Sequence, residues 1–346
     1  MAHHTNSSFL LSDKRHFWHM AEPFVWSYKS SDPKEDPARS IMRTLWDQPR
    51  WLEAYHLYDE RGSELFEKIC TLPEYYLTRT ENSILEQEAK RIMTAAPVKC
   101  IIELGAGSAK KTTHLLQAQI EVYGSGIFAP IDVSLSGLLI SRDYVRGHLP
   151  AIDFQGLHAR YEDGFSSIDL NLPKLFVFLG STIGNFTPPA FTRFFAQLSA
   201  AMGPNDFLLL GADRIKDAAV LEAAYDDPKG LTADFILNVF DHINRLLDSN
   251  FNRQKMRYHS WYNPEWRQIE MYAISTADQT IECPAFATAF QWEKGERILV
   301  EISRKFDPVR LQGQLRFFDL LPVEHFTDPQ NWFSLLLFRK ASRRLH

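Results

Sequence analysis

The sequence predicts an α/β protein with a Rossmann-like core and a second α+β lobe, and three observations lead to that prediction. Short apolar runs such as 98–104 and 175–180 contain no alternating polar residues, which is typical of strands covered on both faces. Stretches with helical spacing lie between these runs, so strands alternate with helices as in βαβ units. A turn containing glycines directly follows the first run, as in ligand-binding α/β sheets.

The predicted core begins with a helix over 80–96, where Ile84, Leu85, Ala89 and Ile92 recur at helical spacing. Five strands are predicted after it, at 98–104, 127–133, 154–158, 175–180 and 207–212. A helix over 189–201 connects the last two. No apolar run approaches the ~18 residues of a membrane-spanning helix, and the longest runs have the length of buried strands.

The alternation of single strands and helices ends after Lys216. Residues 217–250 have helical spacing, and 256–306 have the pattern of strands. Two late strands, 318–322 and 332–338, are expected to complete the parallel sheet. The predicted cofactor-binding core therefore covers 80–215 plus 306–346, and the predicted substrate-binding lobe covers 1–79 plus 216–305.

Composition excludes several classes of function. The 346 residues carry a net charge of −5, which argues against nucleic acid and anionic membranes as partners. The three cysteines lie far apart and have no metal-ligand spacing, so we expect a reduced cytoplasmic protein without a metal site. We expect a monomer with a small-molecule substrate.

The turn after the first strand carries the strongest local signal. Gly105 and Gly107 allow a ligand to approach the backbone, but Lys110 stands where a dinucleotide-binding loop has its third glycine. Glu103 would repel a pyrophosphate, whereas it suits a cofactor that carries an ammonium and a sulfonium. Asp132 ends the second strand, where its carboxylate can accept from two ribose hydroxyls. These features favour S-adenosyl-L-methionine; a plain βα turn and a helix cap are the alternative.

Several longer blocks of sequence resemble one family, the histidine-specific N-methyltransferases of ergothioneine biosynthesis. They are YDERGSELF at 58–66, LPEYYLTR at 72–79, ELGAG at 103–107 with Lys111-Thr112, FLGSTIGN at 178–185, AYDD at 224–227, IEM at 269–271 and EISRKF at 301–306. The resemblance covers about residues 50–340 in unbroken order. It implies a class I methyltransferase core and transfer of three methyl groups to the α-amino nitrogen of L-histidine, giving hercynine, with S-adenosylhomocysteine as the second product.

The resemblance also implies roles for individual residues. Those expected at the amino acid are Tyr75, Glu301 and Ser303 at the imidazole, Asn185 and Tyr225 at the carboxylate, Asn185, Gly180 and Tyr58 near the amine, and Met271 in the pocket wall. Tyr58 and Asn185 are the expected catalytic residues. At the cofactor the resemblance implies Gly105, Lys111 and Asp132; Glu103 and Gly107 are expected there from the turn itself, and Tyr161 as a ring that stacks on the adenine.

The chemistry of these residue types is compatible with the roles. Methyl transfer is an in-line displacement, so its barrier falls mainly through positioning. Glu301 and Ser303 stand two residues apart and share one face of a strand, where an acceptor and a hydroxyl can bind both imidazole nitrogens. Taken alone, Glu301 is more typical of a solvent-facing charge, Tyr75 and Tyr225 of core or rim tyrosines, and Met271 of core packing.

The sequence departs from the family pattern after the third strand. The family has an Asp-Phe pair there that contacts the adenine, whereas this chain has Arg160-Tyr161 followed by Glu162 and Asp163. This leaves the recognition of adenine open. The alternatives to histidine methylation are a related methyltransferase acting on another amino acid or a tryptophan-derived amine, a nicotinamide-dependent oxidoreductase, and a non-enzymatic scaffold.

Overall fold

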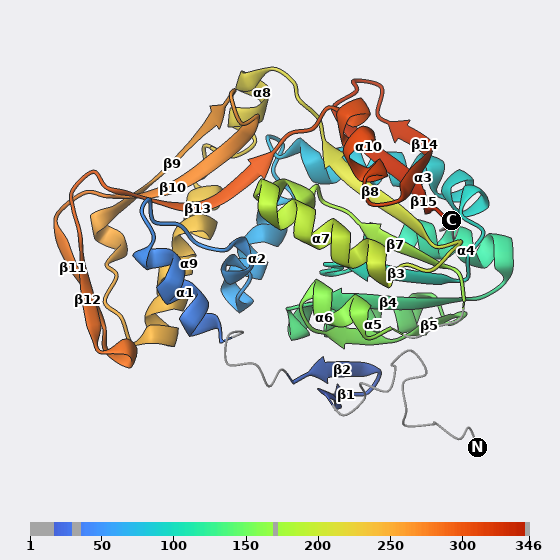
Figure 1. Cartoon of the computed structure of the whole chain (residues 1–346), viewed down its shortest axis with the longest axis horizontal. Coiled ribbons are helices and arrows are strands. Elements are labelled where there is room, and N and C mark those ends of the chain that lie inside the picture. Colours follow the sequence, from blue (N-terminus) through green and yellow to red (C-terminus); the bar gives the residue numbers. More distant parts are fainter. Residues whose placement is uncertain (1–16, 30–35, 169–171, 343–346) are drawn as a thin grey trace.

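A computed structural model describes residues 17–29, 36–168 and 172–342. Its largest feature is a ten-stranded sheet with strand order β1-β2-β6-β4-β3-β7-β8-β15-β14, in which β5 pairs with β4 (Figure 1). These strands are β1 (Trp18–Glu22), β2 (Val25–Tyr28), β3 (Cys100–Leu104), β4 (Gly126–Asp132), β5 (Ile152–Phe154), β6 (Gly156–His158), β7 (Lys174–Phe178), β8 (Phe207–Asp213), β14 (Leu320–Thr327) and β15 (Phe333–Lys340). The central strands β6, β4, β3, β7 and β8 are parallel, as predicted.

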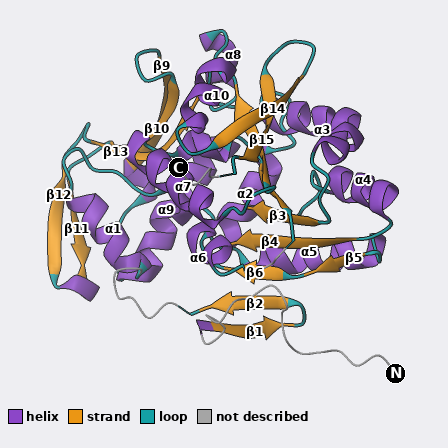
Figure 2. Ribbon diagram, turned by 45° about the vertical axis from the view of Figure 1, so that its right-hand side comes forward, coloured by secondary structure: helices purple, strands orange, loops and turns teal. Residues whose placement is uncertain are grey.

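Helices cover both faces of this sheet (Figure 2), and every residue of strands β3, β7 and β8 is buried. They are α3 (Tyr76–Ala95), α4 (Thr113–Tyr123), α5 (Leu135–His148), α6 (Tyr161–Ser166), α7 (Pro188–Ala201) and α10 (Pro308–Arg316). Two apolar clusters result, one on each side of the sheet. The α/β class and the Rossmann-like core predicted from the sequence are confirmed.

Three details differ from the predictions. The predicted strand 154–158 is divided into β5 and β6. Gln155 lies between them, and its backbone amide donates to the Phe128 carbonyl oxygen. The last strand does not complete a parallel sheet: β15 runs antiparallel to both β8 and β14. The connection between β14 and β15 is short, and such a connection joins only antiparallel neighbours.

The third difference concerns the start of the chain. Residues 1–79 were expected to lie in the substrate-binding lobe, but β2 pairs in parallel with β6 and so extends the large sheet. The hairpin of β1 and β2 lies along that edge in Figure 1. The described residues 17–28 therefore pack with the core, whereas 36–75 pack with the other lobe.

The remaining elements form a second assembly on the other side of the molecule (Figure 1). A three-stranded antiparallel sheet has the order β13-β10-β9, beside the two-stranded sheet of β11 and β12. The elements are β9 (Met256–Asn263), β10 (Gln268–Ser275), β11 (Gln279–Cys283), β12 (Thr288–Trp292), β13 (Arg297–Arg304), α1 (Pro37–Trp46), α2 (Glu60–Ile69), α8 (Ala218–Ala223), α9 (Leu231–Leu247) and the 3-10 turns η3 (Ala54–Leu57), η5 (Arg253–Lys255) and η6 (Pro284–Phe286). Helix α9 packs against α2 and against the sheet.

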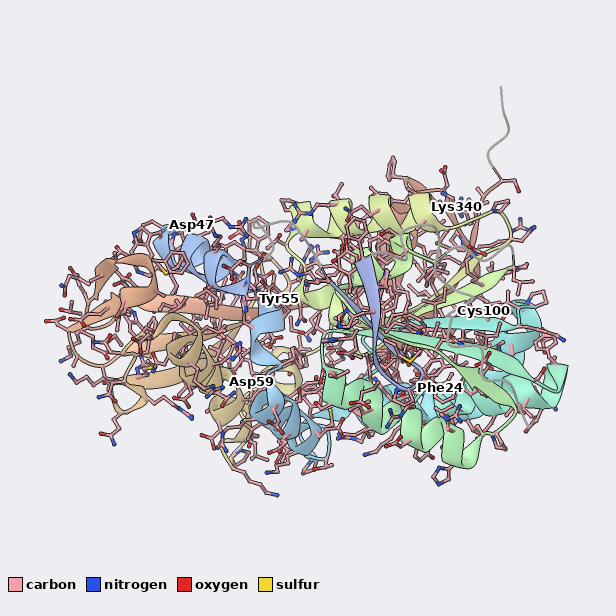
Figure 3. The ribbon with its side chains drawn as sticks, turned by 90° about the horizontal axis from the view of Figure 1, so that it is seen from below. Phe24, Asp47, Tyr55, Asp59, Cys100 and Lys340 are labelled. Atoms are coloured by element: carbon pink, nitrogen blue, oxygen red, sulfur yellow. The ribbon has the colours of Figure 1, made fainter. Side chains whose placement is uncertain are left out.

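The segments around η3 and the 3-10 turn η4 (Thr182–Asn185) lie at the junction of the two halves. Figure 3 shows Tyr55 of η3 on a segment that lies between them. The turn η4, which follows β7, packs against β13 of the second assembly. A carbon atom added at Gly184 would lie 2.9 Å from the carbonyl oxygen of Arg304, so only glycine allows this approach. The residues that follow β7 are therefore fixed between the two halves.

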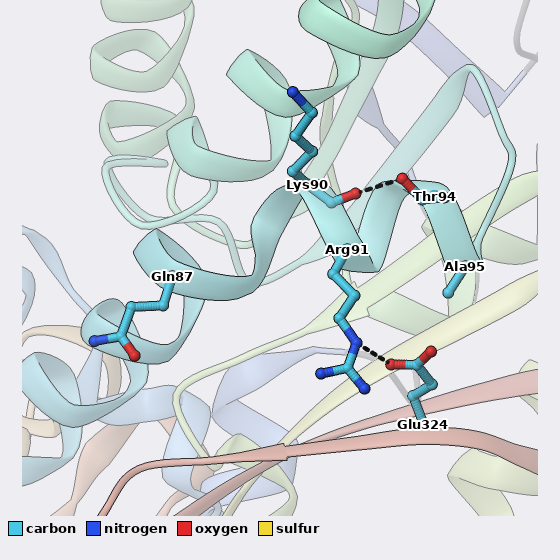
Figure 4. A pocket seen from close by; sticks show the side chains of 6 residues that line it. All are labelled: Gln87, Lys90, Arg91, Thr94, Ala95 and Glu324. Carbon is cyan, nitrogen blue, oxygen red and sulfur yellow. Dashed lines mark hydrogen bonds and ion pairs between the residues drawn. The ribbon is translucent and has the colours of Figure 1, made fainter.

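A shallow hollow on α3 lies away from this junction. Its lining residues are Gln87, Lys90, Arg91, Thr94, Ala95 and Glu324 (Figure 4). Arg91 pairs with Glu324 at 2.9 Å, which joins α3 to the edge strand β14. None of the residues predicted to bind substrate or cofactor lines this hollow. None of the described helices is both long and apolar enough to cross a bilayer.

Candidate active site

The turn after β3 has the backbone conformation that its glycines permit. Gly105 and Gly107 have φ angles of 77° and 50°, and the Gly107 amide donates to Asp132 Oδ2 at 3.0 Å. The other carboxylate oxygen of Asp132 accepts from the Ser134 amide at 2.8 Å. Because a carboxylate oxygen can accept more than one hydrogen bond, Asp132 keeps capacity for a ligand. The turn and the end of β4 are thus fixed against each other.

Glu103 lies buried beneath this turn. Thr112, at the start of α4, donates to Oε1, whereas Oε2 is buried and has no partner among the described residues. Burial raises the pKa of Glu103 to about 8. A buried polar oxygen without a partner is costly, and a cationic ligand group would relieve that cost. The turn therefore fits the charged methionine end of S-adenosylmethionine.

A buried carboxylate that the sequence analysis did not identify connects the cofactor turn to the substrate residues. Glu81 of α3 is fully buried, pairs with Lys111, and accepts from the Gly180 amide at 2.8 and 2.9 Å. A carbon atom added at Gly180 would lie 3.7 Å from Lys111 Nζ. The predicted cofactor residue Lys111 and the predicted substrate residue Gly180 are therefore neighbours, held by one carboxylate.

Asn185 and Glu301 meet where the two halves join. The Asn185 amide nitrogen donates to Glu301 Oε1 at 2.6 Å, from η4 to β13. Burial raises the pKa of Glu301 to about 8, although the bond from Asn185 and the charge of Lys305 oppose the shift. Glu301 is 9% exposed, so it is not a solvent-facing charge. Met271 of β10 is its cross-strand partner.

Ser303 lies two residues further along β13. Its hydroxyl and that of Tyr225 are 2.8 Å apart, and Lys305 Nζ lies 2.9 Å from Ser303 Oγ and 2.8 Å from the Tyr225 oxygen. Lys305 also pairs with Asp213 at 2.8 Å, and both side chains are fully buried. Asp213 ends β8, so this polar cluster also joins the large sheet to the second assembly.

Aromatic rings surround these polar groups. Tyr75 contacts Tyr225 edge to face, with ring centres 5.9 Å apart. Tyr58 contacts Phe66 and Phe235 in the same way, at 5.5 and 5.6 Å. Burial raises the pKa of Tyr58 well above its ordinary value, and the charge of Glu301 adds to the shift. Both tyrosines therefore stay protonated near neutral pH, and aromatic faces of this kind accommodate a cation.

The departure at Arg160-Tyr161 has a structural counterpart. Tyr161 begins α6, and its hydroxyl would lie 2.7 Å from a carbon atom added at Gly105, so it lies against the cofactor turn. Arg160 points to the other half: it donates to the Tyr55 hydroxyl at 2.9 Å, with its guanidinium 4.7 Å from the centre of that ring. Arg160 thus connects the two halves beside η3, the turn that leads directly to Tyr58.

The structure brings the predicted residues together in two neighbouring groups. Glu103, Gly105, Gly107, Asp132 and Tyr161 surround the turn, whereas Tyr58, Tyr75, Asn185, Tyr225, Met271, Glu301 and Ser303 surround the junction. Lys111 and Gly180 lie between the two groups. Within the described ranges, no group of three or more His, Cys, Asp or Glu side chains could hold a metal ion.

Sequence reasoning missed Glu81, Thr112, Asp213 and Lys305, although patterns existed for three of them. Glu81 shares a helix face with Leu77, Ile84 and Leu85, so a charge there had to be buried. Asp213 ends a strand, where α/β sheets place polar groups near ligands. Lys305 continues the alternation of Glu301 and Ser303. No comparable pattern identifies Thr112.

The strand order, the glycine turn and the buried acidic residues around it define a Rossmann-like methyltransferase domain. A family model described as histidine-specific methyltransferase, SAM-dependent, matches residues 37–340. The chain belongs to this family, and it is therefore a methyltransferase that uses S-adenosylmethionine.

Individual relatives agree with this assignment. The chain is 35% identical to the histidine N-alpha-methyltransferase of Mycobacterium tuberculosis, over 87% of this chain and 94% of that protein. Its identity to the protein of the same name from Mycolicibacterium smegmatis is 34%, over 90% and 97%. Ergothioneine biosynthesis protein 1 of Neurospora crassa is 30% identical over 78% of this chain, which corresponds to 30% of that longer protein.

Proposed function

We propose that this chain transfers three methyl groups from S-adenosylmethionine to the α-amino nitrogen of L-histidine, giving hercynine. The observation that carries this proposal is the pairing along β13. Glu301 and Ser303 are hydrogen-bonded to Asn185 and Tyr225, respectively. Each residue assigned to the imidazole thus touches a residue assigned to the amino-acid end, so the imidazole and the amino-acid end would be bound within one small site.

The hydrogen-bonding capacity of these groups suits histidine. Glu301 and Ser303 supply an acceptor and a hydroxyl for the two ring nitrogens. The Asn185 amide has a second N–H for the carboxylate. An apolar side chain in this place would leave buried polar groups without partners, which disfavours phenylalanine and similar substrates.

The roles of the other residues follow from their positions. When bound, S-adenosylmethionine supplies an electrophilic methyl group on its sulfonium. Glu103, Gly105, Gly107, Lys111, Asp132 and Tyr161 would hold it on the side of the large sheet. Tyr58, Asn185 and the Gly180 backbone would orient the neutral amine, whose lone pair forms the new N–C bond as the C–S bond breaks. The nitrogen loses a proton before each further transfer.

The proposal includes the organisation of the molecule. The second assembly, with residues 36–75, would supply most of the amino-acid site, and the large sheet would supply the cofactor site. We also propose that the chain acts as a monomer on a small-molecule substrate. The three free cysteines support a reducing location such as the cytoplasm.

Calorimetry tests whether histidine is the methyl acceptor. Histidine should bind without added metal, and S-adenosylhomocysteine should strengthen its binding because Glu81 links the cofactor residue Lys111 to the substrate residue Gly180. Tryptophan is the matched comparison, since it keeps the amino-acid end and replaces the imidazole. Tighter binding of tryptophan than of histidine would contradict the proposal and favour a relative acting on a tryptophan-derived amine.

A further inference from the structure

Lys305 is a buried cation to which the proposed function assigns no role. It directly follows β13, and its side chain is fully buried. Its ammonium nitrogen has three neighbours: Asp213 Oδ2 at 2.8 Å, the Tyr225 oxygen at 2.8 Å and Ser303 Oγ at 2.9 Å. Two of these neighbours are proposed to bind the amino acid.

The number of available hydrogens determines the direction of each bond. A lysine ammonium has three donors and no acceptor, so Asp213, Tyr225 and Ser303 must each accept one bond from Lys305. Each of the two hydroxyls then still has its own hydrogen. One of those hydrogens lies between Tyr225 and Ser303, which are 2.8 Å apart, and the other is free to donate elsewhere. When a ligand separates the two hydroxyls, both hydrogens become available to it.

We propose that Lys305 is a positioning residue, which fixes the hydroxyls of Tyr225 and Ser303 as donors toward the bound amino acid. This inference rests on the proposed function and deepens it. The Tyr225 hydroxyl would donate to the substrate carboxylate, and the Ser303 hydroxyl would donate to the unprotonated ring nitrogen. Glu301 would accept from the ring N–H. The site would therefore favour histidine with a neutral imidazole in one tautomer.

The surroundings of Lys305 keep it in the form that this role needs. Burial disfavours the charge, but Asp213 and then Tyr225 outweigh that effect and raise the pKa of Lys305 above its ordinary value. Asp213 itself accepts from Tyr76 at 2.8 and 2.9 Å, so its position is fixed from a third side. The ammonium is therefore a permanent donor at neutral pH.

A purely structural ion pair is the competing explanation, and the chain offers a matched control for it. Lys216 also donates to Asp213, at 2.5 Å from Oδ1, and to the Tyr76 hydroxyl at 2.7 Å. Its third hydrogen bond goes to the Arg214 carbonyl oxygen at 2.8 Å, so its three donors reach neither Tyr225 nor Ser303. Loss of either lysine removes one cation from the same buried carboxylate, but only loss of Lys305 releases the two hydroxyls.

The test measures histidine binding by calorimetry on the full chain saturated with S-adenosylhomocysteine. Lys305→Met should weaken histidine binding about 10- to 100-fold, the scale of lost charge-assisted hydrogen bonds. Lys216→Met should change it by no more than about twofold. Both variants should lower the melting temperature and keep their affinity for S-adenosylhomocysteine. Unchanged histidine binding in Lys305→Met would overturn the proposal.

A double-mutant cycle separates action through the hydroxyls from a general loss of order. In a Tyr225→Phe/Ser303→Ala background, adding Lys305→Met should cost no more than about twofold in histidine affinity. The same large loss in that background would mean that Lys305 acts by another route. If Lys305→Met alone does not bind S-adenosylhomocysteine, the variant Lys305→Met/Asp213→Asn, which removes both buried charges, replaces it; wild-type histidine affinity in that variant also overturns the proposal.

Failure of the proposed function gives a different result. If the wild-type protein does not bind histidine, that result counts only against histidine as the methyl acceptor. The same cycle is then measured with the amino acid that does bind, because Lys305 contacts the hydroxyls whichever side chain the substrate carries.

Discussion

Asn185 and Glu301 are joined by a hydrogen bond of 2.6 Å that runs from the turn after β7 to strand β13. The two residues belong to different halves of the molecule and lie 116 positions apart in the chain. The contact therefore depends on the way in which the second assembly docks on the large sheet. A ligand bound between these residues would contact both halves of the molecule.

Replacing Glu301 tests its proposed contact with the imidazole. Glu301→Ala should weaken histidine binding by roughly 1.5–3 kcal/mol, because it removes a charge-assisted hydrogen bond. Calorimetry with S-adenosylhomocysteine present measures the change, and binding of S-adenosylhomocysteine itself serves as the control. Unaltered histidine affinity would show that Glu301 does not touch the ring.

The stability of the ligand-free protein should depend on pH through the same residue. Burial raises the pKa of Glu301 from 4.5 to about 8, so the folded state binds a proton more tightly than the unfolded state. The free energy of unfolding should therefore fall as the pH rises between these two values. Glu301→Gln cannot titrate, so urea denaturation should show a smaller fall for it. Parallel curves for the two proteins would argue against a buried Glu301.

Gly184 tests the docking of η4 on β13. A methyl group there would lie 2.9 Å from the Arg304 carbonyl oxygen, and neither backbone segment can yield easily. Gly184→Ala should cost about 1–3 kcal/mol of stability and should weaken histidine binding by moving Asn185 from Glu301. Gly147→Ala is a control on a helix, because no atom lies within 4 Å of its added carbon. Equal effects of the two substitutions would be inconsistent with the close approach at Gly184.

Two adjacent lysines test the link between the cofactor turn and Gly180. Lys111 pairs with the fully buried Glu81, whereas Lys110 pairs with Glu67 and both of those side chains are mostly exposed. Lys111→Met should destabilise the protein by about 3 kcal/mol, because it leaves a buried carboxylate without its partner. Lys110→Met should cost less than about 1 kcal/mol. Denaturation and S-adenosylmethionine binding measure both variants; similar losses would mean that Glu81 does not depend on Lys111.

The parallel core was predictable because its signals are local. Unbroken apolar runs, helical spacing and the glycines at 105 and 107 each act within a few residues. The direction of β15 was not predictable from its composition, since an apolar run is compatible with either orientation. The pairing of β2 with β6 joins segments more than a hundred positions apart, and no local pattern indicates it.

The site shows the same division. Glu103 and Asp132 were predictable from their positions near the ends of strands, whereas Glu301 and Ser303 were assigned only through the resemblance to the family. The Lys305–Asp213 pair was not, because it requires the end of β8 to meet the end of β13. The role of Arg160 was also not predictable, because its contact with Tyr55 depends on where η3 lies relative to α6.

The central claim is that the chain methylates the α-amino nitrogen of histidine. Mass spectrometry of a mixture of all the common amino acids, incubated with the protein and S-adenosylmethionine, measures this directly. The account predicts that histidine alone gains mass, in steps of one methyl group that end at the trimethylated product. Methylation of tryptophan or another amino acid with histidine left unmodified would contradict it.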